Sequence, residues 1–161
     1  MIRKSCFFIG HREASDDLLP ILEQAVEKHI VEYGVDEFIV GGYGGFDRWA
    51  AHAVMCRKRQ YPHITLSLLL PYHPAERPIT APPGFDNTYY PPGMESVPRK
   101  FAIVQANRYM VDHVDYLIAY AWHPASNARN LVDYARKREA KGQIRITLLE
   151  KSNIPHTADK T

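Results

Sequence analysis

FIVGGYGGFDRWAA, residues 38–51, is the stretch that most constrains the fold of this chain. Its apolar run breaks into four glycines within five residues and continues as helix-forming sequence, which predicts a strand, a glycine loop and a helix. Glycine lacks a Cβ, so such a loop lets a ligand approach the backbone closely. The first N–H groups of the following helix have no partners inside the helix, and they favour an anion such as phosphate.

The glycine loop alone does not identify a ligand. Its spacing fits neither the pattern G-x-x-x-x-G-K-[ST] nor an uninterrupted G-x-G-x-x-G. A tight turn without any ligand therefore stays a second interpretation of residues 41–45.

The composition is typical of a globular protein with one core. The 161 residues suit a single domain, and apolar residues make up 45% and charged residues 24% of them. The longest apolar run, residues 64–71, is too short to span a bilayer. The apolar run near the amino-terminus stops before His11, which predicts a first strand instead of a secretion signal, so we expect a cytoplasmic protein.

Charge and cysteine content argue against two classes of protein. The net charge of +2 is too mild for a dedicated nucleic-acid binder, so nucleic acid is not an expected partner, nor is a membrane. Cys6 and Cys56 lie in a predicted strand and a predicted helix, without a C-x-x-C motif. We expect reduced thiols in the core and no disulfide or metal site built on them.

Strands and helices alternate along the chain. Short apolar runs predict strands at residues 6–9, 36–40, 64–70, 115–122 and 144–149. Helical periodicity predicts helices at residues 17–33, 47–59, 100–112 and 128–141. Such alternation implies right-handed crossovers and a sheet covered on both faces. We therefore predict an α/β fold, a Rossmann-like three-layer sandwich with a mostly parallel sheet of about five strands, in a single domain over residues 1–150.

Residues 74–98 interrupt this alternation. They hold seven of the twelve prolines and show neither the helical nor the strand period. Long irregular loops inside compact domains are often lids or binding loops, which favours a lid over a purely structural insertion. Residues 151–161 are expected to form a polar tail.

The predicted topology selects a set of candidate ligand-binding residues. In open α/β sheets a ligand lies beyond the carboxyl ends of the strands. The selected residues that follow predicted strands are Gly10, His11, Arg12, Gly41, Gly42, Tyr43, Gly44, Gly45, Asp47, Tyr72, His73, Trp122, Ser126 and Asn127. Two helix amino-termini, an arginine and three aromatic rings describe a nucleotide better than a neutral metabolite.

His11 and Asp47 are the candidate catalytic residues. Arg12 would bring a phosphate beside His11, so hydrogen bonding or proton transfer is its expected role. Asp47 either hydrogen-bonds a ribose or a water, or lies in the first helical turn, where the dipole favours a carboxylate. Ser126 is not surrounded by a G-x-S-x-G motif, so we expect it to cap a helix or contact phosphate.

Two further patterns have ordinary explanations. His11, His73 and His123 all follow strands, but without local spacing such as H-x-x-x-H, so no metal ligand and no certain cofactor is predicted. The basic run Arg136-Lys137-Arg138 is expected to be a solvated helix end.

Three motifs occur in a fixed order: CFFIGHR at residues 6–12, GGYGGFD at residues 41–47 followed by two alanines, and NRYMVDH at residues 107–113. Together they resemble the signatures of YpsA-like proteins of the SLOG superfamily, which also includes DprA and the Lonely Guy phosphoribohydrolases. The resemblance covers about residues 4–149. It implies a Rossmann-like fold that binds a nucleotide or nucleotide-derived ligand, and the family also implies a homodimer.

The chain departs from the superfamily pattern in two places. The loop after the fourth strand is HPASNA, residues 123–128, where many members carry a glycine-glycine-threonine element. The phosphoribohydrolase pattern P-G-G-x-G-T-x-x-E is absent, glutamate included. Phosphoribohydrolase activity is therefore not implied by the resemblance.

Three functional hypotheses follow. The leading one is a binding protein, such as a sensor, for a nucleotide or nucleotide-derived phosphate ligand. The alternative is a hydrolase of an N-glycosidic or phosphate bond in such a ligand, with Asp47 or His11 as acid or base. Single-stranded nucleic-acid binding through residues 57–59 and 136–138 is the third, and the mild net charge disfavours it.

Overall fold

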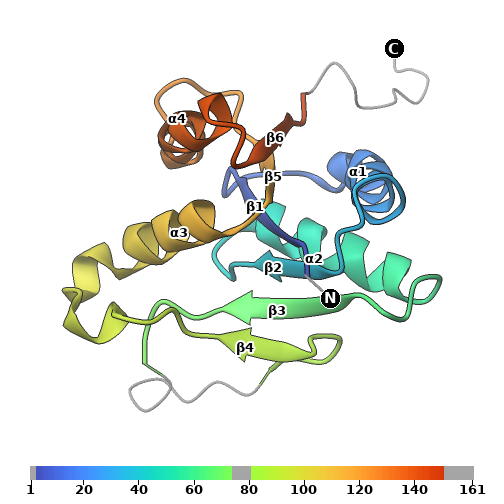
Figure 1. Cartoon of the computed structure of the whole chain (residues 1–161), viewed down its shortest axis with the longest axis horizontal. Coiled ribbons are helices and arrows are strands. Elements are labelled where there is room, and N and C mark those ends of the chain that lie inside the picture. Colours follow the sequence, from blue (N-terminus) through green and yellow to red (C-terminus); the bar gives the residue numbers. More distant parts are fainter. Residues whose placement is uncertain (1–2, 74–80, 151–161) are drawn as a thin grey trace.

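A computed structural model describes residues 3–73 and 81–150. In this part of the chain, six parallel strands form one sheet in the order β4-β3-β2-β1-β5-β6 (Figure 1). The strands are β1 (Ser5–Gly10), β2 (Glu37–Val40), β3 (Thr65–Leu69), β4 (Asn87–Tyr89), β5 (Tyr116–Tyr120) and β6 (Arg145–Leu148). The helices are α1 (Leu19–Val31), α2 (Gly45–Lys58), α3 (Ala102–His113) and α4 (Asn127–Ala140), with short 3-10 turns at Asp16–Leu18, Met94–Ser96 and Arg99–Phe101. The predicted Rossmann-like α/β fold is confirmed.

Strand β1 lies at the centre because both of its faces are apolar. Cys6 and Phe8 belong to the core on one face of the sheet, and Phe7 belongs to the core on the other. All three side chains are fully buried. Successive residues of a strand point to opposite faces, so a strand covered on both faces requires such an uninterrupted apolar run.

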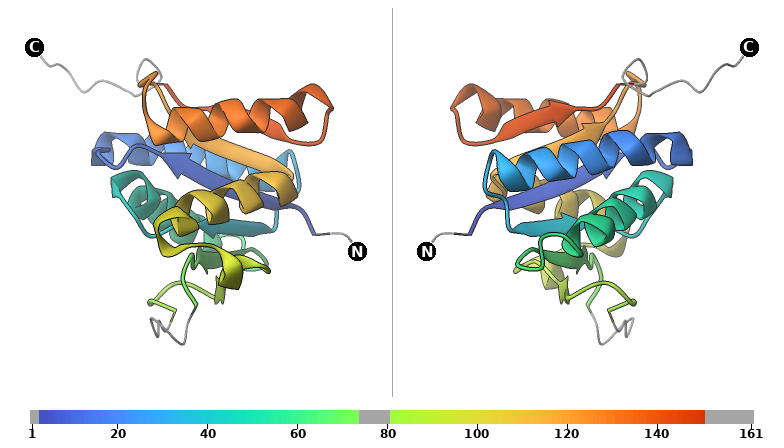
Figure 2. Two further views of the ribbon diagram at one scale, coloured as in Figure 1. Left: turned by 90° about the vertical axis from the view of Figure 1, so that its left-hand side faces the viewer. Right: turned by 90° about the vertical axis from the view of Figure 1, so that its right-hand side faces the viewer.

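Two pairs of helices cover the sheet. Helices α1 and α2 pack on one face and α3 and α4 on the other (Figure 2). Alanines such as Ala53 in α2 and Ala106 in α3 are fully buried, and their small side chains allow each helix to approach the strands closely. The three predicted layers are therefore present.

The direction of the chain across the sheet reverses at β1. From β1 the chain proceeds through β2 and β3 to β4, and it then returns past β1 to β5 and β6. The loop after β1 leads to α1 on one face, whereas the loop after β5 leads to α4 on the other. Neighbouring strands whose loops diverge in this way open a crevice at their carboxyl ends.

The sheet has six strands where the sequence predicts about five. The additional strand, β4, comes from the proline-rich segment and pairs with β3 at the edge of the sheet. Three residues are too few to show an alternating pattern, so this strand was not predicted. Residues 81–98 also supply Met94 to the core, so this part of the segment packs against the sheet. Residues 74–80 and the polar tail, 151–161, lie outside the described residues.

Every predicted helix and strand is present, with bounds that differ by two residues or fewer. At α3, helical periodicity puts Phe101, Val104, Arg108 and Val111 on one stripe, but of these four only Val111 is buried on the inner face. Ala102, Ala106 and Met110 are buried there, whereas Phe101 and Val104 are 54% and 46% exposed. The small alanines form the stripe that approaches the sheet, and the bulkier residues next to it remain in contact with solvent. Among the helices in the described residues, none is long and apolar enough to cross a membrane.

Close packing requires glycine at three positions near the carboxyl ends of β1 and β2. A Cβ on Gly10 would lie 2.2 Å from Cγ of Phe46, a buried side chain of α2. A Cβ on Gly45 would lie 2.9 Å from the carbonyl oxygen of Arg12, and a Cβ on Gly44 would lie 2.8 Å from the Cα of Arg12. The glycine loop therefore packs directly against the backbone that follows β1, and this packing accounts for these glycines without any ligand.

We predict that Gly10→Ala lowers the free energy of unfolding by about 1–3 kcal/mol, the usual cost of forcing extra volume into a packed core. Gly42→Ala is the matched control, because its Cβ would lie an ordinary 3.5 Å from Cδ1 of Leu68. It should change the free energy of unfolding by no more than about 0.5 kcal/mol. Urea unfolding measures both variants, and equal stabilities would contradict the packing role of Gly10.

Candidate functional site

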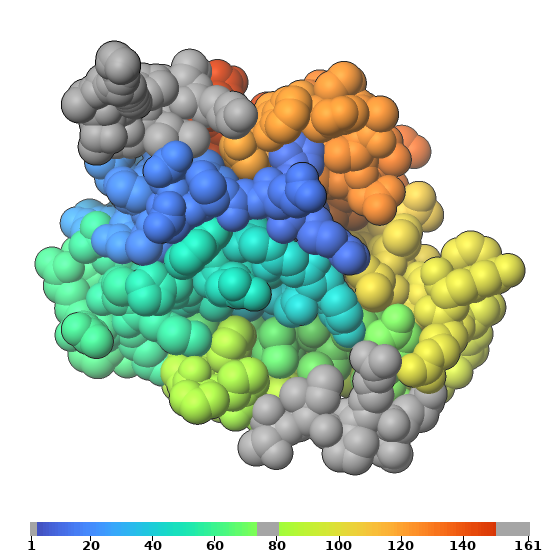
Figure 3. Space-filling model, turned by 180° about the vertical axis from the view of Figure 1, so that it is seen from behind, coloured from blue at the N-terminus to red at the C-terminus, as the bar shows by residue number. Residues whose placement is uncertain are grey.

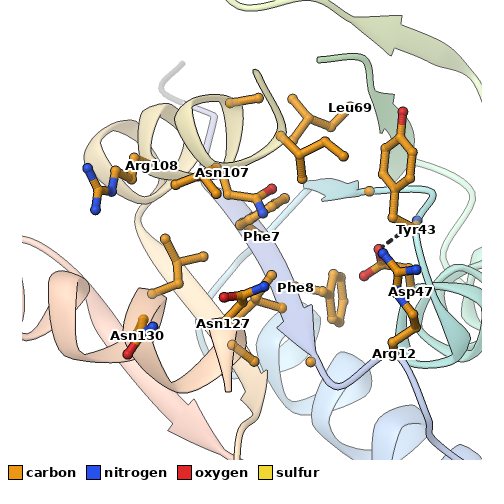
Figure 4. A pocket seen from close by; sticks show the side chains of 18 of the residues that line it. Phe7, Phe8, Arg12, Tyr43, Asp47, Leu69, Asn107, Arg108, Asn127 and Asn130 are labelled. Carbon is orange, nitrogen blue, oxygen red and sulfur yellow. Dashed lines mark hydrogen bonds between the residues drawn. The ribbon is translucent and has the colours of Figure 1, made fainter. Parts of the chain in front are cut away.

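A cavity of about 530 Å³ lies beyond the carboxyl ends of β1 and β2 and between α3 and α4 (Figure 4). Its volume is within the range of roughly 300–1,000 Å³ that is typical of small-molecule sites. Ile9 and Ile103, both partly buried, contribute apolar surface, and the glycine loop and both helices contribute polar groups. We refer to it as the central cavity.

Eight of the fourteen predicted ligand-binding residues line the central cavity: Gly10, His11, Arg12, Gly41, Tyr43, Asp47, Ser126 and Asn127. They come from the loops that follow β1, β2 and β5, which the topology rule had selected. Gly42 and Gly44 instead line a second cavity on the other side of the glycine loop. Gly45, Tyr72, His73 and Trp122 are not among the lining residues of either cavity.

The three predicted aromatic or basic residues outside both cavities have other neighbours. The guanidinium of Arg99 lies 4.8 Å from the ring centroid of Tyr72. The His73 ring packs edge-on against a tyrosine ring at 5.3 Å. Trp122 is 52% exposed and lies edge-on to His11, with the ring centroids 5.2 Å apart. In this arrangement, Tyr72 and Trp122 do not provide stacking surfaces inside the central cavity.

The strand-end rule missed the residues that helices contribute to the central cavity. Asn107 and Arg108 of α3 and Asn130 of α4 line it. Figure 4 shows Asn107 and Asn127 reaching toward the middle of the cavity from opposite helices, whereas Arg108 points to the side. The Arg108 guanidinium lies 5.1 Å from the centroid of a tyrosine ring of α4. The third motif, which includes Asn107, was the signal that could have placed α3 at the site.

Helix α4 begins at the wall of the central cavity. Ser126 is its N-cap: Oγ accepts a hydrogen bond from the Arg129 N–H at 3.1 Å and donates one to the His123 carbonyl oxygen at 2.8 Å. The capping role predicted for Ser126 is confirmed. The dipole of a 14-residue helix and the N–H groups of its first turn favour an anion near Asn127.

At the amino-terminus of α2, the chain itself occupies two of the amide donors. The Gly45 N–H donates to the Arg12 carbonyl oxygen at 2.7 Å, and the Tyr43 N–H donates to Oδ2 of Asp47 at 3.1 Å. The Asp47 carboxylate therefore accepts one of the bonds that the glycine loop would otherwise offer a phosphate. A phosphate at this loop has to use other groups, such as the Arg12 side chain at the cavity wall.

Burial raises the pKa of Asp47 to about 6, although the hydrogen bond from the Tyr43 N–H opposes this increase. A carboxyl group with this pKa exchanges its proton near neutral pH, which suits a general acid or base. The same carboxylate also lies in the first turn of α2 and fixes the glycine loop. Both roles that the sequence left open for Asp47 are thus compatible with its geometry.

His11 connects the loops that follow β1 and β5. Its Nε2 accepts a hydrogen bond from the His123 N–H at 3.2 Å, and its ring lies edge-on to Tyr120 with centroids 5.3 Å apart. Burial, and then the neighbouring His123, lower the pKa of His11 below its usual value of 6.5. The lowered pKa favours the neutral ring, and its Nε2 lone pair is engaged by the His123 N–H, so His11 is first of all a structural bridge between the two loops.

The other two histidines at strand ends do not join His11 in a metal site. The His11 and His123 rings are neighbours, with centroids 6.4 Å apart, while His73 packs against a tyrosine. Within residues 3–73 and 81–150, no three His, Cys, Asp or Glu side chains gather as a metal ion would require.

The basic runs have partners within the fold. Arg57 forms ion pairs with two glutamates of α1 at 3.7 and 3.1 Å, and Lys58 pairs with Asp86. Arg138 donates to two backbone carbonyl oxygens at the carboxyl end of α3, at 2.7 and 2.9 Å. The prediction of a solvated helix end is therefore wrong for Arg138, which caps the preceding helix on that face of the sheet.

Comparison with known proteins supports the resemblance seen in the motifs. Residues 6–78 match the family model described as the YspA SLOG family, YpsA. The resemblance to YpsA-like SLOG proteins is confirmed. In this chain the match includes β1, the glycine loop and β3, and it ends before α3 and α4.

Curated relatives match part of this chain. A UPF0398 protein of Lactiplantibacillus plantarum is 32% identical over 60 residues, 35% of this chain and 32% of the relative. One from Halalkalibacterium halodurans is 37% identical over 54 residues, 32% of this chain and 29% of the relative. One from Brevibacillus brevis is 32% identical over 57 residues, 34% of this chain and 30% of the relative. The matches span about a third of these relatives, whose names state neither a ligand nor an activity.

We predict that Asp47→Asn stabilises the protein at pH 8. The pKa of Asp47 is raised from 3.8 to about 6 by folding, so the folded state loses stability as the pH rises through this interval and the carboxyl group ionises. The amide that replaces the carboxyl group carries no charge, and its oxygen can still accept the Tyr43 N–H bond. The expected gain in the free energy of unfolding is about 1–3 kcal/mol at pH 8 and close to zero at pH 4.

Urea unfolding at the two pH values measures this gain. Asp16→Asn, at an exposed aspartate of the 3-10 turn that precedes α1, is the control and should show little change at either pH. A gain for Asp47→Asn that is the same at pH 4 and pH 8 would contradict the raised pKa.

Proposed function

We propose that this protein binds a nucleotide or nucleotide-derived phosphate ligand in the central cavity, as a binding protein or sensor. The observation that carries the proposal is the position of the cavity, which is enclosed between Arg12 on one side and the amino-terminus of α4 on the other. Both groups attract a phosphate. The match to a SLOG family supports a nucleotide-related ligand.

The phosphate is best accommodated beside Ser126 and Asn127. The first turn of α4 lies at the cavity wall there, and the Asn127 side chain points into the cavity (Figure 4). At α2, by contrast, the Asp47 carboxylate already lies over the glycine loop and would repel an anion whenever it is ionised. Arg12, which is exposed, supplies charge from the opposite side.

The base and ribose have suitable partners among the other residues that line the cavity. The side-chain amides of Asn107 and Asn130 each offer a donor and an acceptor, which is what the edge of a base or a ribose hydroxyl needs. Ile9 and Ile103, which line the cavity and are only partly buried, provide apolar surface on which a planar ring can lie. This mixture of few polar groups and apolar surface is typical of small-molecule sites.

A hydrolase is the second candidate function, and one observation favours it. Asp47, with its pKa raised to about 6, and neutral His11 both line the central cavity. Such a pair could transfer a proton during cleavage of an N-glycosidic or phosphate bond. Chromatography of nucleotide incubations tests this: turnover that Asp47→Asn abolishes without loss of binding supports it, and equal product formation in wild type and variant excludes Asp47 from the chemistry.

We predict that at least one of AMP, ADP and ADP-ribose binds to the protein, as measured by calorimetry. Arg12→Ala should lower the affinity for that probe by about tenfold, because a charge-assisted bond to phosphate is lost. Arg59→Ala is the matched control, since Arg59 is an exposed arginine just beyond α2 and is not among the residues that line either cavity. It should leave the affinity unchanged.

Two outcomes would contradict the proposed function: no binding of any probe below millimolar concentration, or equal losses in Arg12→Ala and Arg59→Ala. Substitutions of Gly45 do not provide a clean test of binding. A side chain there would collide with the backbone after β1 and disturb the fold itself.

A further inference from the structure

The carboxyl group of Asp47 keeps one oxygen atom available to a ligand. Oδ2 accepts the hydrogen bond from the Tyr43 N–H at 3.1 Å, whereas Oδ1 has no hydrogen bond or ion pair with any of residues 3–73 and 81–150. Asp47 is partly buried and lines the central cavity. A carboxylate held away from bulk water is stabilised by hydrogen-bond donors, so a ligand in this cavity gains affinity by supplying them.

At neutral pH this carboxyl group acts as an acceptor. Burial, opposed by the bond from the Tyr43 N–H, raises the pKa of Asp47 to about 6, so the ionised form predominates above this value. An ionised carboxyl group has about four acceptor sites and no proton to donate. In the described part of the chain no residue forms an ion pair with it. The charged or titratable residues that line the two cavities with Asp47 are His11, Arg12, Tyr43, Arg48, His52 and Arg108.

Gly41 leaves the Asp47 carboxyl group accessible. A Cβ on Gly41 would lie 3.0 Å from Oδ2 and 3.8 Å from Cγ of Asp47, so a side chain at this position would crowd the carboxyl group. Gly41 also lines the central cavity. Because this residue has no side chain, a ligand in the cavity can approach Asp47 closely.

Three sides of the central cavity offer three kinds of partner. The first turn of α4, with Asn127, favours a phosphate. Asn107 of α3 offers an amide donor and an acceptor, which suit the edge of a base. The glycine loop presents Asp47, and Figure 4 shows these three side chains approaching the cavity from different sides. In Figure 3 the same segments meet on one side of the molecule, with the glycine loop in cyan, α3 in yellow and α4 in orange.

The side formed by Asp47 suits the hydroxyl groups of a ribose. The ribose joins the phosphate to the base, so with these two groups at α4 and α3 its hydroxyl groups are left for the glycine loop. Hydroxyl groups are neutral donors, which an ionised carboxylate accepts, whereas it repels a phosphate.

We propose that Asp47 binds the 2′- and 3′-hydroxyl groups of the ligand's ribose, and that the site thereby selects ribonucleotides over 2′-deoxyribonucleotides; this rests on the proposed function. Oδ1 accepts a hydrogen bond from one hydroxyl group, and the second lone pair of Oδ2 accepts one from the other. The selection weakens when the carboxyl group is protonated, because a hydrogen bond to an ionised acceptor is roughly twice as strong as one between neutral groups.

The test measures the dissociation constants of ADP and 2′-deoxy-ADP for the whole chain by calorimetry at pH 8 and pH 5. At pH 8 we expect ADP to bind about tenfold more tightly than 2′-deoxy-ADP. At pH 5, where Asp47 is mostly protonated, the two dissociation constants should agree within about threefold. Both probes carry the same terminal phosphate, so its own titration cancels in their ratio.

Asp47→Asn should bring this ratio to within about threefold at both pH values, because the amide does not ionise. Asp16→Asn, at the exposed aspartate before α1, is the matched control, since Asp16 is not among the residues that line either cavity. It should keep both the tenfold ratio and its dependence on pH.

Equal affinities for ADP and 2′-deoxy-ADP at pH 8 would overturn this inference and leave the proposed function standing, because ADP would still bind. A ratio that Asp47→Asn leaves unchanged, or one that is the same at pH 5 and pH 8, would also overturn it. So would a preference for ADP over inosine diphosphate that Asp47→Asn removes, because the carboxylate would then bind the adenine amine. If neither ADP nor 2′-deoxy-ADP binds below millimolar concentration, this inference fails, and the proposed function fails with it only if AMP and ADP-ribose do not bind either.

Discussion

Burial of β1 on both faces is the constraint on which the rest of the structure depends. Its alternating side chains serve two separate cores, so the strand has to lie inside the sheet, with β2 on one side and β5 on the other. The central position makes β1 the point where the chain reverses direction, and the loops after β1 and β5 then diverge to opposite faces. Gly10 ends the strand where only a hydrogen atom fits against Phe46. The central cavity exists because these loops separate there.

The glycine loop has a different physical character from the phosphate cradle that its composition indicates. Its close approach is first of all to the backbone of Arg12, and the Asp47 carboxylate accepts the Tyr43 N–H that a phosphate could have used. Ionisation of this buried carboxyl group costs stability, which is expressed in its raised pKa. A charged group that destabilises the fold while lining two cavities is typical of a functional site, where stability is often sacrificed.

The sequence predicted the fold well because the apolar runs and helical periods that define it are local. It also predicted the loops after β1, β2 and β5 as parts of one site, since parallel strands place their carboxyl ends on one edge. Two kinds of feature could not be predicted. The strand β4 is too short to carry a pattern, and contributions from helix sides, such as Asn107 and Asn130, depend on how α3 and α4 pack over the sheet. The role of Arg138 could not be predicted either, because the carbonyl oxygens to which it donates lie at the carboxyl end of α3.

Chemical-shift mapping by NMR tests the central claim most directly, because it reports where a ligand lies without requiring any substitution. On titration with ADP, the account predicts that the largest amide shifts cluster at Arg12, Tyr43, Asn107 and Asn127, which surround the central cavity in space but are distant in sequence. Shifts confined to the basic residues 136–138, or no shifts at millimolar ADP, would contradict it.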